Sequence, residues 1–448
     1  MKVIIIGCTH AGTAAAKTML TENDDIDVTI YERNDNVSFL SCGIALYVGG
    51  TVKDVDGLFY SSPDELQALG ADVHMEHEVT ELDQAAKTLK VKDLKTGEEF
   101  EDSYDKLVMT TGSWPIIPPL DHLDAENLLI CKNFHHAQNL IQNKTDKQKI
   151  AVIGGGYIGV ELVEAFQKDG KDVTLIDAEN HILSKYLDTE LIEHLESDMK
   201  EAGIDLALGQ KVTGFKVDGQ NILRAVETEK ESFEVDMAVL CVGFKPVADL
   251  FGPLKTTAAG ALEVDDYMHT SDPDIFAAGD SCAVNYNPNG GHAYIPLATN
   301  AVRMGQLVGK NIKADRVKYR GTQSTSGLKL FGWTIGTTGV ADNTAENFGL
   351  STHSVTFSDW YRPEFMPTNE KVHMKLVYEQ DSGRIVGGQL MSKYDITQSA
   401  NTLSVAIQNK MTIEDLAYVD FLFQPNFDRP WHYLNLLAQA ALAQEEEK

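Results

Sequence analysis

The chain carries one local pattern twice: an apolar run, a glycine-containing turn, an alanine- or valine-rich stretch, and a second apolar run that ends in an acid. The first copy contains KVIIIGCTHAGTAAAKTML and DVTIYER, and the second contains KIAVIGGGYIGVELVEAFQKDG and DVTLIDAE. Runs of β-branched residues predict buried strands, and the stretch after each turn predicts a helix. Strand, turn, helix and strand, with an acid roughly 20 positions after the glycines, is the fingerprint of a dinucleotide-binding fold. We therefore expect an α/β protein with two Rossmann-like domains.

The glycines of such a turn have separate roles. The first makes the turn, the second lets the backbone approach a pyrophosphate, and the third lets the helix pack on the strand. The helix N-terminus then offers unpaired N–H groups to the phosphates. The second copy matches fully with Gly154, Gly156 and Gly159, whereas the first has Gly7, Thr9 and Gly12, with Ala11 beside them. Two copies in register argue against a glycine-rich turn without function.

Each copy ends in an acid, Glu32 in the first and Asp177 in the second. An acid at this position accepts hydrogen bonds from a ribose. Asp177 is followed by Ala178 and not by an arginine, which favours a ligand with a free 2′-hydroxyl. We therefore expect the second fold to bind NAD(H) rather than NADP(H).

Composition limits the partners and the location. A chain of 448 residues predicts about three domains. The net charge of −29 argues against a surface for nucleic acid or an anionic membrane. No apolar run approaches the roughly 18 residues that span a bilayer, and the N-terminal run is too short for a signal peptide. The five cysteines are scattered, unlike a disulfide framework or a zinc site, so we expect a cytoplasmic protein with reduced thiols and no metal.

A third segment, TSDPDIFAAGDS at residues 270–281, predicts a buried strand that presents Asp280 at its C-terminal end. With this segment and two dinucleotide folds, the chain resembles the flavoprotein disulfide reductases, in which the equivalent segment returns to the first domain and binds the flavin ribityl chain. TTGSWP at 110–115 and CVGFKP at 241–246 are similar to that family's crossovers between its FAD and NAD domains. The resemblance implies an FAD domain in two parts, 1–113 and 243–320, and an NAD(H) domain, 114–242, between them.

Residues 321–448 carry no dinucleotide motif. They contain the plausible strands KVHMKLVYE and RIVGGQLM and the amphipathic helices TQSANTLSVAIQNKM and HYLNLLAQAALAQ. The resemblance implies that this part is an α+β dimerisation domain and that the protein is a homodimer.

The segment SFLSCGIALYVGG, at 38–50, holds one cysteine, Cys42, where ordinary disulfide reductases of this shape have a CxxxxC pair; position 47 is a tyrosine. Free cysteines most often pack as small buried hydrophobes, and we accept that interpretation for the other four. Ser41 is a plausible N-cap, which would place Cys42 in the first turn of a helix. A thiol at a helix N-terminus has a lowered pKa, so we expect a thiolate that cycles through sulfenic acid or a mixed disulfide.

Further stretches narrow the resemblance and extend it over essentially the whole chain. GCTHAG, YERN, SFLSCGIALYVGG, MTTGSWPIIPP and FQPNFDRPWHYLN are similar to the NADH oxidase/NADH peroxidase group, and GIALYVGG to its water-forming members from lactic-acid bacteria. The resemblance implies that Cys42 alternates between thiolate and sulfenic acid and that His10 lies near the sulfur. An imidazole there can donate or relay protons for the sulfur and the peroxide oxygens. The alternative for His10 is a polar residue that caps the helix.

The same motif matches imply which residues hold cofactor and substrate. For FAD they place Glu32 at the adenosine ribose and Asp280 at the ribityl chain. Along the rest of the cofactor they place Thr110, Thr111, Gly112, Ser113, Lys132, Leu297, Ala298 and Thr299 of the same subunit. Phe423 is expected to reach the flavin pocket of the partner subunit. For NADH they place Tyr157 over the flavin face where nicotinamide enters, together with Ile158, Glu161, Tyr186 and Gly243. For each aromatic residue the alternative is core packing.

These features predict an FAD-dependent enzyme that oxidises NADH and reduces O2 by four electrons to two water molecules through Cys42, with peroxide as an intermediate. Three alternatives stay open. An NADH peroxidase shares SFLSC and His10 but takes peroxide from solution. A coenzyme A disulfide reductase forms a mixed disulfide on a lone cysteine, but it needs basic phosphate partners, and few lysines or arginines lie near these motifs. The last alternative is a flavin-bound redox sensor.

Overall fold

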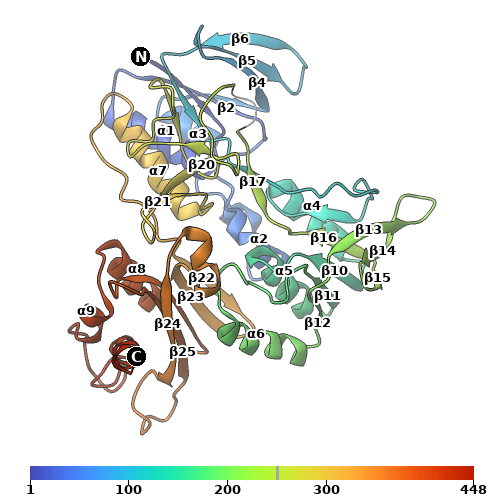
Figure 1. Ribbon diagram of the computed structural model, residues 1–448. Coiled ribbons are helices and arrows are strands. Elements are labelled where there is room, and N and C mark those ends of the chain that lie inside the picture. Colours follow the sequence, from blue (N-terminus) through green and yellow to red (C-terminus); the bar gives the residue numbers. More distant parts are fainter. Residues whose placement is uncertain (249–251, 448) are drawn as a thin grey trace.

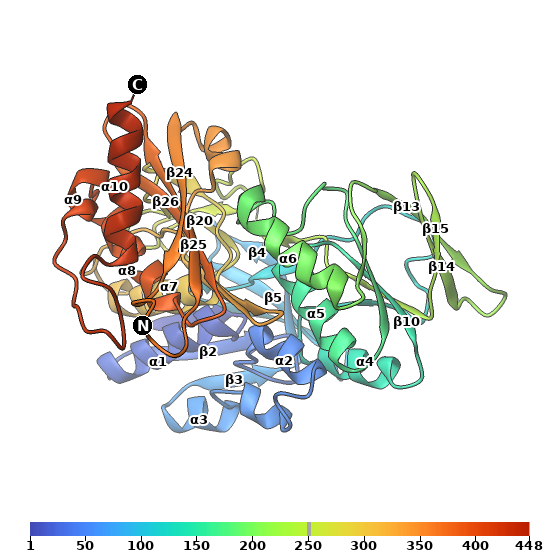
Figure 2. The ribbon, with the colours of Figure 1, turned by 90° about the horizontal axis from the view of Figure 1, so that it is seen from below.

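Three five-stranded sheets organise residues 1–248 and 252–447, which are the residues that the computed structural model describes. In Figure 1 the first sheet and its helices lie at the top, the second at the right, and the third at the lower left. Figure 2 shows the C-terminal helices on the side of the third sheet that faces away from the second fold.

The first sheet is parallel and has the order β19-β7-β1-β2-β3. The predicted strand, helix and strand are β1 (Lys2–Ile6), α1 (His10–Glu22) and β2 (Asp27–Glu32). The other strands come from later in the chain and are β3 (Asp72–Met75), β7 (Lys106–Met109) and β19 (Ile275–Ala277). Because β19 pairs with β7, the predicted return of residues 270–281 to the first fold is confirmed. Helix α7 (Ala298–Asn311) then packs closely along α1 (Figure 1).

The second sheet repeats this plan with the order β12-β11-β10-β16-β9, again all parallel. Its strand, helix and strand are β10 (Lys149–Ile153), α5 (Tyr157–Lys168) and β11 (Asp172–Ile176). The remaining elements are β9 (Leu128–Ile130), α4 (Phe134–Lys144), α6 (Thr189–Glu201), β12 (Asp205–Ala207) and β16 (Met237–Leu240). The central strands β10 and β16 are almost wholly buried, as expected for a parallel sheet covered on both faces. The predicted pair of Rossmann-like folds is confirmed.

Two short antiparallel strands, β8 (Ser113–Pro115) and β17 (Phe244–Pro246), pair where the chain crosses between the folds. They contain the stretches that the sequence predicts as crossovers. Smaller elements complete the two folds: α2 (Ile44–Val48), α3 (Pro63–Ala68), β4 (His77–Asp83), β5 (Thr88–Asp93), β6 (Glu99–Ser103), β13 (Val212–Val217), β14 (Leu223–Thr228), β15 (Ser232–Glu234), β18 (Leu262–Glu263), β20 (Cys282–Tyr286) and β21 (Gly291–Ala293).

The C-terminal part is an antiparallel sheet with the order β22-β23-β26-β25-β24. Its strands are β22 (Ser326–Leu330), β23 (Trp333–Gly339), β24 (Thr352–Trp360), β25 (Lys371–Glu379) and β26 (Ile385–Ser392). The helices are α8 (Thr397–Gln408), α9 (Ile413–Ala417) and α10 (Tyr433–Glu446). Leu403 of α8 and Leu437 of α10 share a buried core with Leu376 of β25, so the predicted α+β domain is confirmed. Across 1–248 and 252–447, no helix is long and apolar enough to cross a membrane.

Both glycine turns bring backbone so close to a neighbouring strand end that no side chain fits. Gly7 and Gly154 have φ angles of +89° and +110°, where L side chains are strained. A Cβ on Gly7 would lie 2.6 Å from the Thr110 carbonyl oxygen. A Cβ on Gly154 would lie 2.4 Å from the carbonyl oxygen of Cys241. The middle glycine, Gly156, faces open space, so this turn leaves room for a ligand on its outer side.

We predict that Gly154→Ala destabilises the protein by about 2–4 kcal/mol, because a side chain there combines a strained φ with a backbone clash. Thermal unfolding of the purified variant measures this as a lowered Tm. Gly156→Ala is the matched control, because its φ is −77° and a Cβ would meet nothing within 4 Å. Equal Tm values for the two variants would contradict the clash.

Candidate active site

The carboxyl ends of the parallel strands gather the candidate residues of the first fold. His10 begins α1 just after β1, Glu32 ends β2, and Asp280 follows β19. Thr110 follows β7 in the middle of the same sheet. Parallel strands end at one edge of a sheet, and ligands of such folds bind outside that edge. The structure therefore brings these four residues to one side of the first fold.

The acid at the end of the second strand binds its own glycine turn in both folds. Glu32 is buried and accepts a hydrogen bond from the Cys8 N–H at 2.6 Å, and burial raises the pKa of Glu32. Asp177 accepts one from the Gly155 N–H in the equivalent place and another from the Glu179 N–H at 2.8 Å. A carboxylate that fixes the turn also faces the place where a ribose would bind beside it. The ribose contacts themselves stay predictions.

Ser113, Lys132 and Asp280 form one polar cluster at the junction of the folds. The Ser113 hydroxyl donates to Asp280 at 2.8 Å, and the Lys132 ammonium donates to Ser113 at 2.8 Å. Lys132 also lies 3.7 Å from the Asp280 carboxylate and 4.6 Å from the centroid of the Phe244 ring. All three are predicted to bind FAD, and the fold brings them together from three separate segments.

The other positions proposed for FAD lie in the loops around this cluster. The Thr110 hydroxyl donates to the Gly7 carbonyl at 2.6 Å, which ties β7 to the first glycine turn. The Thr111 hydroxyl donates to the Val247 carbonyl at 2.5 Å. The remaining positions are at a left-handed turn and at the start of α7: Gly112, Leu297, Ala298 and Thr299.

Cys42 lies in a single 3-10 turn, Ser41–Gly43, that leads into the five-residue helix α2. The Ser41 side chain caps no helix, so the predicted N-cap is wrong. The predicted lowering of the thiol pKa is also wrong: partial burial and the carboxylates of Glu161 and Asp280 raise the pKa of Cys42. A single tight turn has no aligned stack of peptide dipoles to stabilise a thiolate, whereas two nearby carboxylates oppose one.

The exposure of Cys42 separates it from the other cysteines. Its side chain is exposed, whereas Cys8, Cys131 and Cys282 are buried and Cys241 is half-buried. Burial raises the pKa of each of these four thiols. The interpretation of the four as packing residues agrees with this arrangement, and Cys42 is the thiol that a small oxidant can reach.

Glu161 lies on α5 of the second fold. Among the charged residues that act on Cys42, Glu161 contributes most, and it raises the pKa of the thiol. Burial, with a contribution from Glu164, raises the pKa of Glu161 to about 7. The carboxylate therefore changes charge near neutral pH, within range of the thiol. A carboxyl group with a pKa raised in this way is typical of a functional site.

His10 is held by a residue that sequence analysis did not single out. The Nδ1 atom of His10 lies 2.7 Å from the Tyr60 hydroxyl oxygen, and the two rings are stacked. Its Nε2 atom is buried and has no hydrogen-bond partner in the described chain. Burial, helped by Lys132 and opposed by Asp280, lowers the pKa of His10. Nothing in the sequence around Tyr60 signals this contact, because the two residues are 50 positions apart.

His10 and Cys42 are linked through shared charges. Asp280 and Lys132 both act on the pKa of His10, and the same two residues act on the pKa of Cys42. The imidazole and the thiol therefore lie within electrostatic range of the same two charges. The pairing of His10 with the sulfur stays a prediction.

The aromatic candidates of the second fold pack on each other at the boundary with the C-terminal sheet. The rings of Tyr157 and Tyr186 are 4.2 Å apart. The Tyr157 hydroxyl lies 2.8 Å from the Ser326 hydroxyl of β22 and 3.3 Å from that of Thr337 in β23. Two further candidates are Ile158, the second residue of α5, and Gly243, which precedes β17 in the crossover. Their contacts with NADH stay predictions.

Phe423 lies far along the chain, between α9 and α10, and half of its side chain is exposed. It belongs to an exposed apolar group in the same region: Tyr418, Leu422, Phe423, Phe427 and Trp431. Monomeric proteins rarely expose such a group, and it is typical of an interaction surface.

The residues at this edge fit two dinucleotides. Beside the first turn, the Nε2 atom of His10 and the hydroxyl of Tyr294 are buried polar atoms without a partner within 1–248 and 252–447. Tyr294 lies near enough to Asp280 for that carboxylate to raise its pKa. Beside the second turn, the space over Gly156 is open. Within the same residues, no cluster of three His, Cys, Asp or Glu side chains could hold a metal ion.

These features are typical of an oxidoreductase that binds two dinucleotides. Comparison with known proteins shows the family to which the chain belongs. The pyridine nucleotide-disulphide oxidoreductase family matches residues 1–305, and the dimerisation domain of that family matches residues 325–433. The chain belongs to this family, as its resemblance to the flavoprotein disulfide reductases predicted.

Its relatives are closely similar over the full length. The chain is 59% identical to an NADH oxidase of Enterococcus faecalis over 443 residues, covering 99% of both chains. It is 37% identical to an NADH oxidase of Lactococcus lactis, covering 98% of this chain and 99% of that one. Its structure matches a water-forming NADH oxidase from Lactobacillus brevis bound to NADH, with a TM-score of 0.98, 55% identity, and coverage of 100% and 99%.

We predict that Glu161→Gln lowers the pKa of Cys42, because it removes the carboxylate whose charge opposes the thiolate most strongly. The pH dependence of Cys42 alkylation by iodoacetamide in the holoenzyme measures this shift. Glu164→Gln is the matched control on the same helix, since Glu164 accepts from the Phe331 N–H and does not act directly on Cys42. An unchanged alkylation profile in Glu161→Gln would show that this carboxylate does not control the thiol.

Proposed function

We propose that this protein is an FAD-dependent NADH oxidase that reduces O2 by four electrons to two water molecules. The observation that carries the proposal is an exposed thiol, Cys42, on which the charges of Lys132 and Asp280 act as they do on His10, in a chain with two dinucleotide folds. NADH oxidases with the same domain organisation match the chain from end to end, and one of them is described as water-forming.

We place FAD on the first fold and NADH on the second, with domain boundaries at 1–113, 114–242, 243–320 and 321–448. Glu32, Ser113, Lys132 and Asp280 would hold FAD, and Asp177 would hold the ribose of NADH. When bound, FAD supplies two-electron transfer from NADH to oxygen and to an oxidised thiol. Tyr157 and Tyr186 would orient the nicotinamide, since their rings pack on each other at the boundary between the second fold and the C-terminal sheet.

Cys42 acts on the peroxide that the first two electrons produce. The thiolate attacks one peroxide oxygen, so an S–O bond forms, the O–O bond breaks, and hydroxide leaves as water after protonation. The resulting sulfenic acid takes two electrons from a second NADH, which restores the thiolate and releases the second water. In sum, two NADH and two protons reduce one O2.

His10 holds a hydrogen-bond donor toward the reacting atoms in this cycle. Its lowered pKa keeps the imidazole neutral at neutral pH. Burial raises the pKa of Tyr60, which stays protonated and can donate to Nδ1 of His10. The ring proton is then on Nε2, the buried atom without a partner in the described chain, which can donate a hydrogen bond to a peroxide oxygen or to the sulfur.

We further propose that the protein is a homodimer located in the cytoplasm. The exposed apolar group around Phe423 would lie in the dimer interface, with Phe423 of the partner subunit reaching the flavin pocket. The matched dimerisation domain supports this assembly. The free thiols support a reducing compartment.

The stoichiometry of NADH and O2 tests the reaction. We predict two NADH consumed per O2 and no released peroxide, because Cys42 reduces the peroxide before it leaves. An oxygen electrode and NADH absorbance, each with and without catalase, measure this. One NADH per O2 with accumulating peroxide contradicts water formation, and slow turnover with O2 but fast turnover with added peroxide indicates an NADH peroxidase instead. Faster turnover with coenzyme A disulfide than with O2 would indicate a coenzyme A disulfide reductase. If NADH is not oxidised with O2, peroxide or coenzyme A disulfide, the redox sensor is the remaining alternative.

We predict that Cys42→Ser still oxidises NADH but releases about one peroxide per NADH, since the flavin remains and the thiol is lost. Peroxide assay of the purified variant measures the product. Cys131→Ala is the matched control, because Cys131 is buried and should leave water formation intact. Water formation by Cys42→Ser, or complete loss of its NADH oxidation, would contradict the two-stage scheme.

A further inference from the structure

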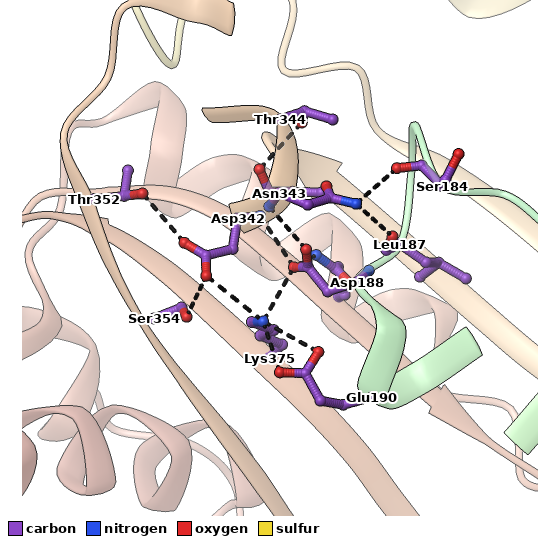
Figure 3. Close-up of polar contacts among 12 residues, drawn as sticks. Ser184, Leu187, Asp188, Glu190, Asp342, Asn343, Thr344, Thr352, Ser354 and Lys375 are labelled. Atoms are coloured by element: carbon purple, nitrogen blue, oxygen red, sulfur yellow. Dashed lines mark hydrogen bonds and ion pairs between the residues drawn. The ribbon is translucent and has the colours of Figure 1, made fainter. Parts of the chain in front are cut away.

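A buried ion-pair network joins the second fold to the C-terminal sheet (Figure 3). At its centre is Lys375 of β25, whose side chain is 6% exposed. Its ammonium lies 3.0 Å from Glu190 and 3.5 Å from Asp188, both near the start of α6, and 3.7 Å from Asp342. Burial alone would lower the pKa of Lys375, but these carboxylates raise it, so the lysine remains charged.

The carboxylate of Asp188 is bonded by residues of the C-terminal part of the chain. It is 2% exposed and is the residue immediately before α6. Its carboxylate accepts hydrogen bonds from the backbone N–H groups of Asp342 at 3.0 Å and Asn343 at 2.9 Å. The side-chain amide of Gln389 also donates to it at 2.7 Å, and the Asp188 N–H donates back to Gln389 at 2.8 Å. We call Asp188 with these partners and Lys375 the Asp188 anchor.

The anchor ends the segment 183–187, which follows β11 and leads into α6. At the start of this segment, the Leu183 N–H donates to the carbonyl of Gly155 in the glycine turn at 2.8 Å. The Asn343 side chain donates to the Ser184 carbonyl at 2.9 Å and to the Leu187 carbonyl at 3.5 Å, and Figure 3 shows it between these two residues. The segment is therefore held both by the turn and by the C-terminal sheet.

The segment carries Tyr186, whose ring packs on Tyr157. The Tyr157 hydroxyl itself bonds Ser326 of β22, so both rings are tied to the C-terminal sheet, one through its hydroxyl and one through the anchor. Replacing one partner of a buried, hydrogen-bonded charge leaves the others unsatisfied, so the anchor admits few alternative arrangements.

We propose that Asp188 is a positioning residue for NADH: the Asp188 anchor holds segment 183–187, and with it Tyr186, in the conformation that receives the nicotinamide nucleotide. This inference rests on the proposed function of the second fold. It means that the C-terminal sheet, beyond forming a dimer, sets the affinity of the same subunit for its reductant.

Asp188→Asn tests the inference for two reasons. The amide nitrogen places N–H groups opposite the N–H groups that now donate to the Asp188 carboxylate. The substitution also removes a negative charge that pairs with Lys375. We expect the KM for NADH and the Kd for NAD+ to rise about 10-fold, with kcat at saturating NADH and FAD content unchanged. Titration calorimetry of NAD+ into the oxidised holoenzyme gives the Kd, and steady-state oxidation gives KM and kcat separately. A general structural defect would instead lower kcat, FAD content and Tm together.

Asn343→Ala is the milder second variant. Asn343 is exposed, so the variant should fold, and it loses the side-chain hold on Ser184 while keeping the buried charges. We expect a smaller rise in KM in the same direction, again without a change in kcat. If Asp188→Asn does not fold, this variant decides the inference by itself.

Lys393→Met is the matched control. Lys393 directly follows β26 of the C-terminal sheet, and its ammonium lies 2.5 Å from the carboxylate of Asp198 on α6. This ion pair also joins the sheet to α6, but Lys393 is exposed and its partner is not in segment 183–187. It should leave NAD+ affinity unchanged. Wild-type affinity in both Asp188→Asn and Asn343→Ala, or an equal loss in Lys393→Met, overturns the inference. Wild-type protein that binds NAD+ without reducing O2 contradicts the proposed function only, and wild-type protein that does not bind NAD+ overturns both.

Discussion

The structure depends on the close backbone approach at the two glycine turns. Without a Cβ at Gly7 and Gly154, strands β1 and β10 turn directly into helices beside the ends of the neighbouring strands. The first residues of these helices then lie at the sheet edge, and they are His10 in one fold and Tyr157 in the other. Equivalent positions of a repeated motif thus carry the proposed proton donor and the proposed nicotinamide contact.

The C-terminal part of the chain bonds two residues of the second fold. Tyr157 bonds β22 through its hydroxyl, and Asp188 bonds residues of the C-terminal part through its carboxylate. Both residues lie at the N-terminal ends of their helices, with Tyr157 as the first residue of α5 and Asp188 immediately before α6. The C-terminal part of the chain therefore contacts the proposed NADH site directly, in addition to its role in the family as a dimerisation domain.

Much of the fold could be predicted because its signals are local. The strand KVHMKLVYE corresponds residue for residue to β25, and the two strand–helix–strand units begin and end within a few positions of their motifs. The return of residues 270–281 to the first sheet was also predictable, since a buried strand that ends in Gly279 and Asp280 matches a known pattern. The thiol environment of Cys42 was not. Ser41 next to a helical stretch favoured an N-cap, but only in the fold does the charge of Glu161, more than a hundred residues away, raise the pKa of Cys42.

By itself the sequence determined that two dinucleotide folds exist, which residues end their strands, and that one cysteine differs from the rest. These features follow from backbone geometry and from the period of apolar residues, which act over a few positions. Only the tertiary structure decided the partners: Tyr60 for His10, Ser113 for Lys132, and the C-terminal donors for Asp188. Hydrogen bonds and charges act through space, so the protonation of the site depends on segments that approach one another only in the folded chain.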